Sequence, residues 1–238
     1  MKIGIDIRKE LFKSIISAFG GNLEYILCGG APLDEKYIFE FRSWGIEILN
    51  AYGVTECSPG VAVNRNFHHK DGSVGLPIPN CQVKISESGE IVVKGDNVMI
   101  GYFKDESATV EAIKDGWYYT GDLGRIDDEG FLYITGRKKN LIILSNGENV
   151  SPEELELLIS RDNGVSEVVI YAENNLIVAE IFPTDNYLNN KEYFDKAISE
   201  INRTLPPYKR INSIRLREVE FEKNTTKKIL RYKVNGGK

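Results

Sequence analysis

At 238 residues, with a formal net charge of −5, 42% apolar and 27% charged residues, the chain has the composition of a globular protein of one or two domains. Three scattered cysteines, Cys28, Cys57 and Cys81, exclude a disulfide framework and a cysteine-rich zinc site. No apolar run approaches the roughly 20 residues of a membrane span, and the N-terminus has no secretory signal pattern, so we expect a cytoplasmic location.

The first 68 residues predict an α/β segment in which two helices alternate with two strands. Apolar residues at i, i+4 and i+8 predict a helix over residues 8–19, and Asp34 is placed to cap a second helix that Gly45 ends. Strands are predicted over residues 24–28 and 46–49, and the alternation implies that they run parallel. Because two parallel strands are too few for a stable sheet, we expect the beginning of this domain to lie outside the chain.

Residues 69–136 carry the pattern of a small β-barrel-like unit. Short strands are predicted over residues 82–86, 90–94 and 131–135, and Asp105 is placed to cap a helix over 105–113. A tight turn over 127–130 leads into the last strand, so Thr120-Gly121-Asp122 and Arg137 are expected in turns at opposite ends of one hairpin. Residues 1–136 are therefore assigned to a large domain that contains a truncated α/β subdomain and a small barrel.

From residue 137 to residue 238 the pattern predicts a separate, small α+β domain. A strand over 140–144 precedes a helix with the capping box Ser151-Pro152-Glu153-Glu154. Strands over 165–171 and 176–182 flank a turn, a helix begins at Asn190, and a last strand covers 213–221. Because the junction has no long flexible linker, we expect the second domain to move on a short hinge.

The net charge hides an asymmetry along the chain. From Arg203 onward there are eleven Lys or Arg and three Glu, which gives +8 and leaves −13 for residues 1–202. A basic tail suits a polyanionic ligand, and nucleic acid, an anionic membrane or a solvated face would also fit. Nucleic acid is the least favoured of these, because the basic residues are confined to the tail and lack an aromatic stacking pattern.

Several residues suit a nucleotide ligand. Gly29-Gly30 follows a predicted strand and allows close approach of a backbone, while Tyr52 offers a flat face on which a purine can stack. Thr55 supplies a hydroxyl for a phosphate, and Glu56 supplies one of the few carboxylates that Mg²⁺ takes beside substrate phosphates. For the first two features taken singly, a tight turn and a core tyrosine remain the simpler interpretations.

Asp122 and Arg137 could hold a ribose diol and a phosphate, although for the two charges taken alone a surface ion pair is the simpler interpretation. The order of the motifs carries more information than any one of them. The segments in order are Cys28-Gly29-Gly30-Ala31-Pro32, Asn50-Ala51-Tyr52-Gly53-Val54-Thr55-Glu56, residues 118–144, and Thr225-Thr226-Lys227-Lys228-Ile229-Leu230-Arg231. This set resembles the later core motifs of the adenylate-forming superfamily, the AMP-producing acyl-CoA synthetases and their relatives.

The resemblance implies a role for each matching position. Thr55 would contact phosphate, Glu56 would bind the metal, and Asp122 would take both ribose hydroxyls. Arg137 would lie near ribose and phosphate, and Lys228 would stabilise charge on the acyl carboxylate and α-phosphate. Lys139 matches the hinge residue, and the implied ligands are ATP or AMP, Mg²⁺, and CoA as co-substrate. The implied adenine pocket consists of Gly29, Gly30, Ala31, Pro32, Tyr52 and Gly53.

The resemblance is strongest to the long-chain fatty acyl-CoA synthetase branch, which activates a fatty acid as an acyl-adenylate and transfers it to CoA. Two departures qualify it. Lys227 stands where the family usually has glycine, and residues 1–27 lack the glycine- and hydroxyl-rich loop that cradles the β- and γ-phosphates. We therefore expect this chain alone to be inactive or nearly so, with the N-terminal half of the same enzyme as its missing partner.

Three alternatives stay open at this point. The acceptor of the acyl group could be a carrier-protein thiol instead of CoA. The chain could be a non-catalytic nucleotide-binding module. A peripheral membrane contact of the parent protein would be compatible with either activity.

Overall fold

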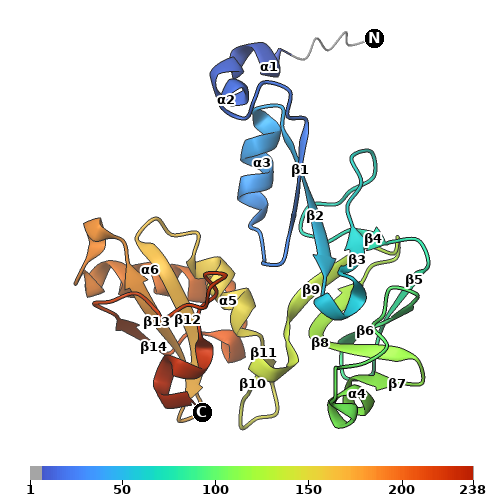
Figure 1. Cartoon of the computed structure of the whole chain (residues 1–238). Helices are drawn as coiled ribbons and strands as arrows, with labels where there is room; N and C mark the ends of the chain where they lie inside the picture. The colour runs from blue at the N-terminus through green and yellow to red at the C-terminus, as the bar shows by residue number, and fades with distance from the viewer. Residues whose placement is uncertain (1–6, 238) are drawn as a thin grey trace. The chain divides into compact units, whose positions relative to one another are not determined.

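The computed structural model describes residues 7–237, and the chain divides into two compact units, Met1–Thr135 and Gly136–Lys238. The predicted domains begin at residue 1 and end at residue 238, and both of these residues lie outside the described range. Each unit has its own sheets and hydrophobic core, and each is described by itself (Figure 1).

The first sheet of the first unit has four strands, in the order β1-β2-β3-β4. β1 runs parallel to β2, with Tyr25 opposite Glu47 and Gly29 opposite Ala51, while the remaining pairs are antiparallel. The predicted cap is confirmed, because the Asp34 side chain accepts a hydrogen bond of 2.8 Å from the Lys36 backbone N–H. The elements are β1 Tyr25–Gly29, α3 Glu35–Ser43, β2 Glu47–Gly53, β3 Gly60–Val63 and β4 Leu76–Pro77.

The helix predicted over residues 8–19 is divided at Phe12 into α1 Arg8–Leu11 and α2 Lys13–Ala18. Its predicted apolar face is not buried, since Leu11 is 70% exposed and Phe19 is 48% exposed, whereas Ile16 is buried. The predicted face consisted of Leu11, Ile15 and Phe19. The buried residue, Ile16, is not part of it, so the periodicity did not identify the side of these helices that packs.

A five-stranded sheet in the order β5-β6-β8-β7, with β9 paired to β8, forms the rest of the first unit. Thr120-Gly121-Asp122 lies inside β8 and Arg137 ends β9, so the prediction that both lie in turns is wrong. A register shift opposite Glu90 and Val92 and a φ of +74° at Gly121 mark a bulge, which lets a polar segment run within a strand. The elements are β5 Cys81–Ile85, β6 Glu90–Gly95, α4 Glu106–Ala112, β7 Ile113–Lys114, β8 Trp117–Ile126 and β9 Leu132–Arg137.

The second unit is built on the sheet β12-β13-β14. β12 and β13 are antiparallel around Asn174 and Asn175, which both have positive φ as a tight hairpin turn requires. Asn190 caps α6 as predicted, accepting from the Tyr193 backbone N–H at 3.2 Å. The elements are β10 Ile142–Ile143, β11 Asn149–Val150, α5 Pro152–Ile159, β12 Val165–Glu173, β13 Leu176–Pro183, α6 Lys191–Thr204 and β14 Ser213–Leu216. The 3₁₀ helices of the chain are Thr55–Cys57, Lys138–Asn140, Asp185–Tyr187, Pro207–Lys209 and Arg231–Gly237.

Alternation along β12 sends its side chains to two different cores. Val168 and Ile170 pack in the cluster that contains Leu155 of α5 and Phe194 of α6. Val169 packs instead with residues of the C-terminal segment beyond β14, Phe221 and Val234. This segment therefore covers the second face of the sheet. The strand predicted over residues 213–221 is shorter than expected, because β14 ends at Leu216 and the residues after it are not part of the strand.

Two further local predictions need correction in the second unit. The strand predicted over residues 140–144 is reduced to β10, which pairs with β11. Ser151 makes no side-chain capping bond to α5, because its hydroxyl donates to Glu153 Oε2 at 3.0 Å. The same Glu153 accepts a bond of 2.6 Å from the Asn140 amide, so it ties α5 to the segment after Arg137.

Candidate functional site

The glycine motifs lie at the carboxyl ends of the adjacent parallel strands β1 and β2. A Cβ on Gly29 would lie 2.8 Å from Ala51 O, and a Cβ on Gly53 would lie 2.0 Å from Pro59 O, so both positions exclude a side chain. Ala31 and Pro32 follow in an exposed loop. Carboxyl ends of parallel strands are common ligand sites. The structure thus brings the residues predicted for adenine to one edge of one sheet.

Tyr52 and Asp122 are 70 residues apart in the sequence and meet in the structure. The Tyr52 hydroxyl donates to Asp122 Oδ2 at 2.7 Å, and Asp122 is 4% exposed. Burial, followed by the charge of Asp122, raises the pKa of Tyr52 well above its usual range. Tyr52 therefore binds the carboxylate through its hydroxyl, a contact that the interpretation of Tyr52 as a stacking face did not include.

The bulged strand around Asp122 is held by β6. The Gly121 N–H donates to Glu90 Oε1 at 2.9 Å, and the Thr120 hydroxyl donates to Ile91 O at 2.8 Å and accepts from the Asp122 N–H at 3.1 Å. Glu90 is 4% exposed, which is rare for a carboxylate. Sequence reasoning missed Glu90, although a glutamate directly before three apolar residues was a usable signal.

Thr55, Glu56 and Cys57 form a single 3₁₀ turn after β2. The turn is bonded to the segment between β6 and α4: the Met99 N–H donates to Glu56 O at 2.7 Å, and the Tyr102 hydroxyl donates to Glu56 Oε1 at 2.9 Å. Thr55 is exposed and Glu56 is half-buried. Tyr102 is a second residue that the sequence interpretation missed, since its partner lies 46 residues away.

Glu56 suits a magnesium ion that binds together with a nucleotide. No group of three or more His, Cys, Asp or Glu that could hold a metal occurs within residues 7–237. Mg²⁺ typically takes one or two carboxylates together with substrate phosphates, so the single carboxylate of Glu56 suits an ion that arrives with a nucleotide. The donor set does not suit a permanently bound metal.

The buried cysteines have no catalytic character. Burial, followed by its neighbour Cys81, raises the pKa of Cys57 to about 12, and burial also raises the pKa of Cys81. A thiol acts as a nucleophile only as its thiolate, which these pKa values disfavour at neutral pH. Both side chains instead belong to the hydrophobic core of the first unit.

Arg137, Lys139 and Lys228 belong to the second unit, where Arg137 and Lys139 are exposed. Lys228 ends a tight loop in which Asn224 Oδ1 accepts from the Lys228 N–H at 2.9 Å and the Thr226 N–H at 3.0 Å. Lys227 has a φ of +61° in this loop. That left-handed conformation explains why a glycine is suited to the position, and Asn224 is the organising residue that sequence reasoning missed.

The basic tail is largely neutralised by carboxylates of its own unit. Arg217 pairs with Glu180 of β13 at 2.5 Å, and Lys209 pairs with Glu154 of α5 at 2.6 Å. Arg231 pairs with the side chain of Glu156. The tail is therefore not a continuous basic surface for a polyanion. Further ion pairs join Arg215 to Glu173, Lys223 to Glu167 and Glu220, and Lys233 to Glu222.

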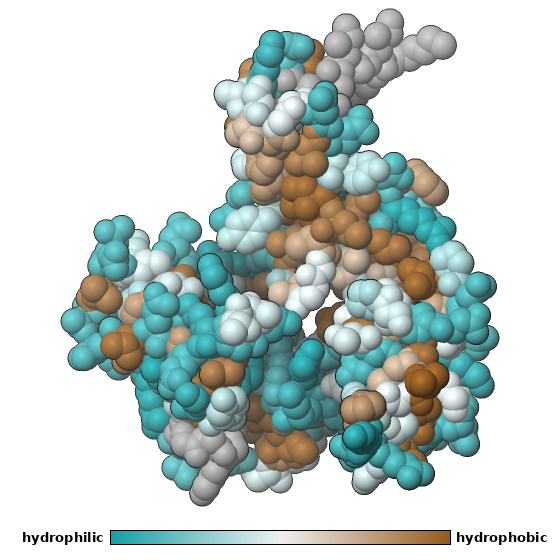
Figure 2. Space-filling model, viewed as in Figure 1, coloured by the Kyte–Doolittle hydropathy of each residue, from teal (hydrophilic) through white to brown (hydrophobic). Residues whose placement is uncertain are grey.

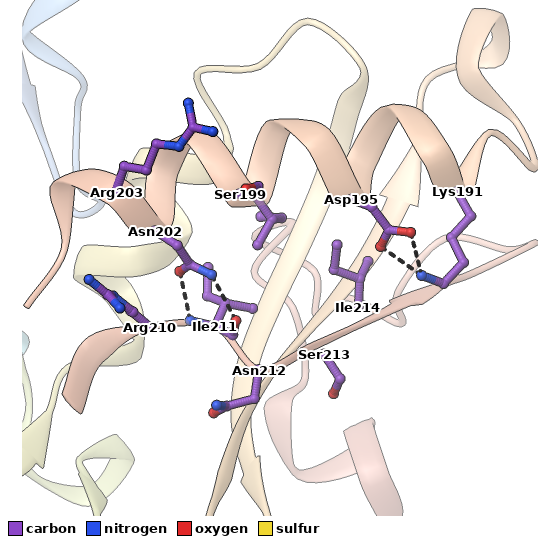
Figure 3. A pocket seen from close by; sticks show the side chains of 11 residues that line it. Lys191, Asp195, Ser199, Asn202, Arg203, Arg210, Ile211, Asn212, Ser213 and Ile214 are labelled. Atoms are coloured by element: carbon purple, nitrogen blue, oxygen red, sulfur yellow. Dashed lines mark hydrogen bonds and ion pairs between the residues drawn. The ribbon is translucent and has the colours of Figure 1, made fainter. Parts of the chain in front are cut away.

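A hollow of about 630 Å³ lies in the second unit between α6 and β14 (Figure 3). Asn202 closes one end by pairing with both backbone groups of Ile211, at 2.8 and 2.9 Å, and Lys191 binds Asp195 at the other end. None of the residues predicted for nucleotide, metal or catalysis lines it. In the part of the chain that the structure describes, no helix is long and apolar enough to cross a membrane.

Comparison with known proteins connects this arrangement to a family. Residues 7–103 match the AMP-binding enzyme family, and residues 139–235 match the AMP-binding enzyme C-terminal domain. A long-chain-fatty-acid–CoA ligase of Mycobacterium bovis, FadD15, is 38% identical over 175 residues, which cover 74% of this chain and 29% of that protein. The long-chain-fatty-acid–CoA ligase of Salmonella typhimurium is 37% identical over 223 residues, covering 85% and 38%.

The fold agrees with solved members. The o-succinylbenzoate CoA synthetase of Bacillus subtilis, bound to its acyl-adenylate intermediate, has a TM-score of 0.81 and 29% identity over 97% of this chain and 50% of that chain. The same enzyme with ATP and a magnesium ion has a TM-score of 0.77 and 28% identity. The chain thus spans about half the length of this solved neighbour and about a third of the two curated relatives.

Proposed function

The chain belongs to the AMP-binding enzyme family, and we propose that it forms part of an ATP-dependent, AMP-forming acid:CoA ligase whose acid is a long-chain fatty acid. In this proposal an acyl-adenylate forms with release of pyrophosphate, and the acyl group then passes to the thiol of CoA. The observation that carries the proposal is the Tyr52–Asp122 hydrogen bond, which joins two separate nucleotide motifs beside the carboxyl ends of β1 and β2.

The nucleotide would bind along that edge of the first unit. Gly29 and Gly53, at the ends of β1 and β2, let the backbone segments at this edge pack closely together, and the adenine would lie against this edge and the adjoining loop of Gly30, Ala31 and Pro32. Asp122 would take the ribose hydroxyls while Tyr52 holds one of its oxygens. The Thr55 hydroxyl would donate to a phosphate oxygen. Mg²⁺, held by Glu56 together with the phosphates, would neutralise phosphate charge when bound.

The second unit would supply the groups that act on the reacting atoms. Lys228 would donate to the acyl carboxylate and the α-phosphate, a task that suits a mobile ammonium on a long stem. Arg137 would lie near ribose and phosphate. Lys139 would serve as the hinge on which this unit turns, so that the loop over residues 145–150 faces the thiol donor for thioester formation.

The proposal includes a partner for the exposed side of the first sheet. β1 is an edge strand, and Tyr25 and Leu27 on it are 51% and 63% exposed; Phe39 of α3 is 71% exposed. Figure 2 shows apolar residues gathered over this part of the first unit. Parallel sheets are normally covered on both faces, so the rest of an AMP-binding domain would pair with β1 and cover these side chains. A cytoplasmic location belongs to the same proposal.

The acid is the least constrained element of the proposal. Long-chain-fatty-acid–CoA ligases support a fatty acid, whereas a 2-succinylbenzoate–CoA ligase of Bacillus subtilis, 41% identical over 157 residues, supports a smaller aromatic acid. A carrier-protein thiol as acceptor and a non-catalytic nucleotide-binding module are the alternatives. Competition between CoA and a pantetheine-bearing carrier separates the acceptors, and retained AMP binding without turnover in a completed domain would favour the module.

Photolabelling with 8-azido-AMP tests the position of the nucleotide. We expect label on the peptides that contain residues 29–32 or 52–53, and we expect AMP to protect them better than GMP. Label confined to the hollow between α6 and β14, or equal protection by both nucleotides, would contradict the proposed site.

A further inference from the structure

The segment between β6 and α4 makes four hydrogen bonds to the turn that carries Glu56 and to the start of β3. The Asn97 amide donates to Cys57 O at 3.3 Å and to Gly60 O at 2.8 Å. The Met99 N–H donates to Glu56 O at 2.7 Å, and the Tyr102 hydroxyl donates to Glu56 Oε1 at 2.9 Å. The first three bonds fix the backbone of the turn and of Gly60, which follows it. The bond from Tyr102 alone acts on the carboxylate.

Tyr102 is itself held from the opposite side. Its backbone N–H donates to the Thr109 hydroxyl of α4 at 2.9 Å, and a Cβ on the preceding Gly101 would lie 2.8 Å from the Thr109 side chain. Tyr118, which is 4% exposed, lies beside its hydroxyl, and burial together with Tyr102 and Glu56 raises the pKa of Tyr118 well above its usual range. The hydroxyl of Tyr102 is thus fixed by the helix and strand around it.

We propose that Tyr102 is a positioning residue that holds the carboxylate of Glu56 in the orientation needed to bind Mg²⁺ beside the nucleotide phosphates. This inference rests on the proposed function. Glu56 Oε1 accepts from Tyr102, whereas Oε2 makes no hydrogen bond or ion pair among residues 7–237 and remains open to a cation. Tyr102 is 37% exposed, so its hydroxyl contributes more to the orientation of Glu56 than to core packing.

Two effects of removing this hydroxyl oppose each other. Losing a donor leaves more electron density on the carboxylate oxygens, which strengthens a metal bond. Losing the contact also lets the Glu56 side chain rotate freely. Metal binding then has to order this side chain, and the lost conformational entropy weakens binding. Groups that orient a metal ligand typically change affinity by tenfold or more when removed, so we expect the loss of orientation to prevail.

The test measures Mn²⁺ binding to this chain in the presence of saturating AMP, by the enhancement of water-proton relaxation. Tyr102→Phe should weaken Mn²⁺ about tenfold. AMP affinity without metal should stay unchanged, a combination that a general disturbance of the fold would not produce. Tyr119→Phe is the matched control, because Tyr119 lies on β8 and its hydroxyl makes no hydrogen bond among the described residues. Glu56→Gln reports whether Glu56 binds the metal at all.

The variants separate the inference from the function on which it rests. If Glu56→Gln abolishes Mn²⁺ binding and Tyr102→Phe matches the wild type or binds more tightly, the positioning role is wrong while the metal assignment stands. If wild type and Glu56→Gln bind Mn²⁺ equally, or neither binds it, the metal assignment fails and the inference fails with it.

Discussion

Removing the Tyr52 hydroxyl tests the contact that joins the two nucleotide motifs. Tyr52→Phe keeps the aromatic ring and takes away the donor that lies 2.7 Å from Asp122 Oδ2. Because Asp122 is 4% exposed, water has little access to replace that donor. A hydrogen bond to a charged group contributes about 1.5–3 kcal/mol, so we expect the free energy of unfolding of the first unit to fall by about 2 kcal/mol.

The chain offers a selective probe for this measurement. Both of its tryptophans, Trp44 and Trp117, belong to the first unit, so tryptophan fluorescence during urea unfolding reports on that unit alone. With a slope of about 2 kcal/mol per molar urea, the midpoint should fall by about 1 M. Tyr119→Phe should shift the free energy of unfolding by less than about 0.5 kcal/mol. Equal midpoints for the two variants would refute the reasoning.

Three further predictions follow from local geometry and charge. Lys227→Gly should stabilise the second unit by about 0.5 kcal/mol in calorimetry, because glycine relieves the left-handed φ, whereas Lys227→Ala should give no gain. Gly53→Ala should destabilise the first unit by more than about 3 kcal/mol in urea unfolding, since its Cβ would lie 2.0 Å from Pro59 O, and a mild effect would contradict the packing. The Lys70 ammonium lowers the pKa of Asp127 from 3.8 to about 2, so stability present above pH 4 should be lost as the pH falls through 2. In Asp127→Asn, the urea midpoint should fall less between pH 5 and pH 2 than it does in the wild type. An unchanged pH profile would contradict the role of the Lys70–Asp127 ion pair.

The order of helices and strands was predictable where local signals agreed with tertiary packing. Asp34 and Asn190 cap their helices through their own side chains, and Asn174-Asn175 forms its hairpin turn through its own backbone preferences. These features depend on neighbours within a few residues. They can therefore be derived from short stretches of sequence.

The features that were mispredicted or left open depend on distant partners. Thr120-Gly121-Asp122 has turn-like composition, but pairing with β6 and the bonds to Glu90 draw it into a bulged strand. The basic tail was left open between a ligand surface and a solvated face because its charges were counted along the chain, whereas their partners include carboxylates of α5, β12 and β13. Spacing along one chain does not encode either of these pairings.

The candidate site shows the same division. The motif residues of the first unit were identifiable one by one, and the structure places Gly29, Tyr52 and Asp122 on neighbouring strands or in direct contact. Glu90, which holds the bulged strand at Gly121, and Tyr102, which holds Glu56, were not identified. They act through single hydrogen bonds across 31 and 46 residues of sequence, and they bear no motif of their own.

Titration of this chain with AMP by calorimetry tests the central claim, that the first unit carries a nucleotide site organised by Asp122. Asp122→Asn is the test variant, and Asp128→Asn, at an exposed position in the neighbouring turn, is the control for loss of one charge. We expect binding by the wild type, binding at least about tenfold weaker in Asp122→Asn, and no change in Asp128→Asn. Equal affinity of Asp122→Asn and wild type, or no binding by a wild-type chain whose tryptophan fluorescence shows a folded first unit, would contradict it.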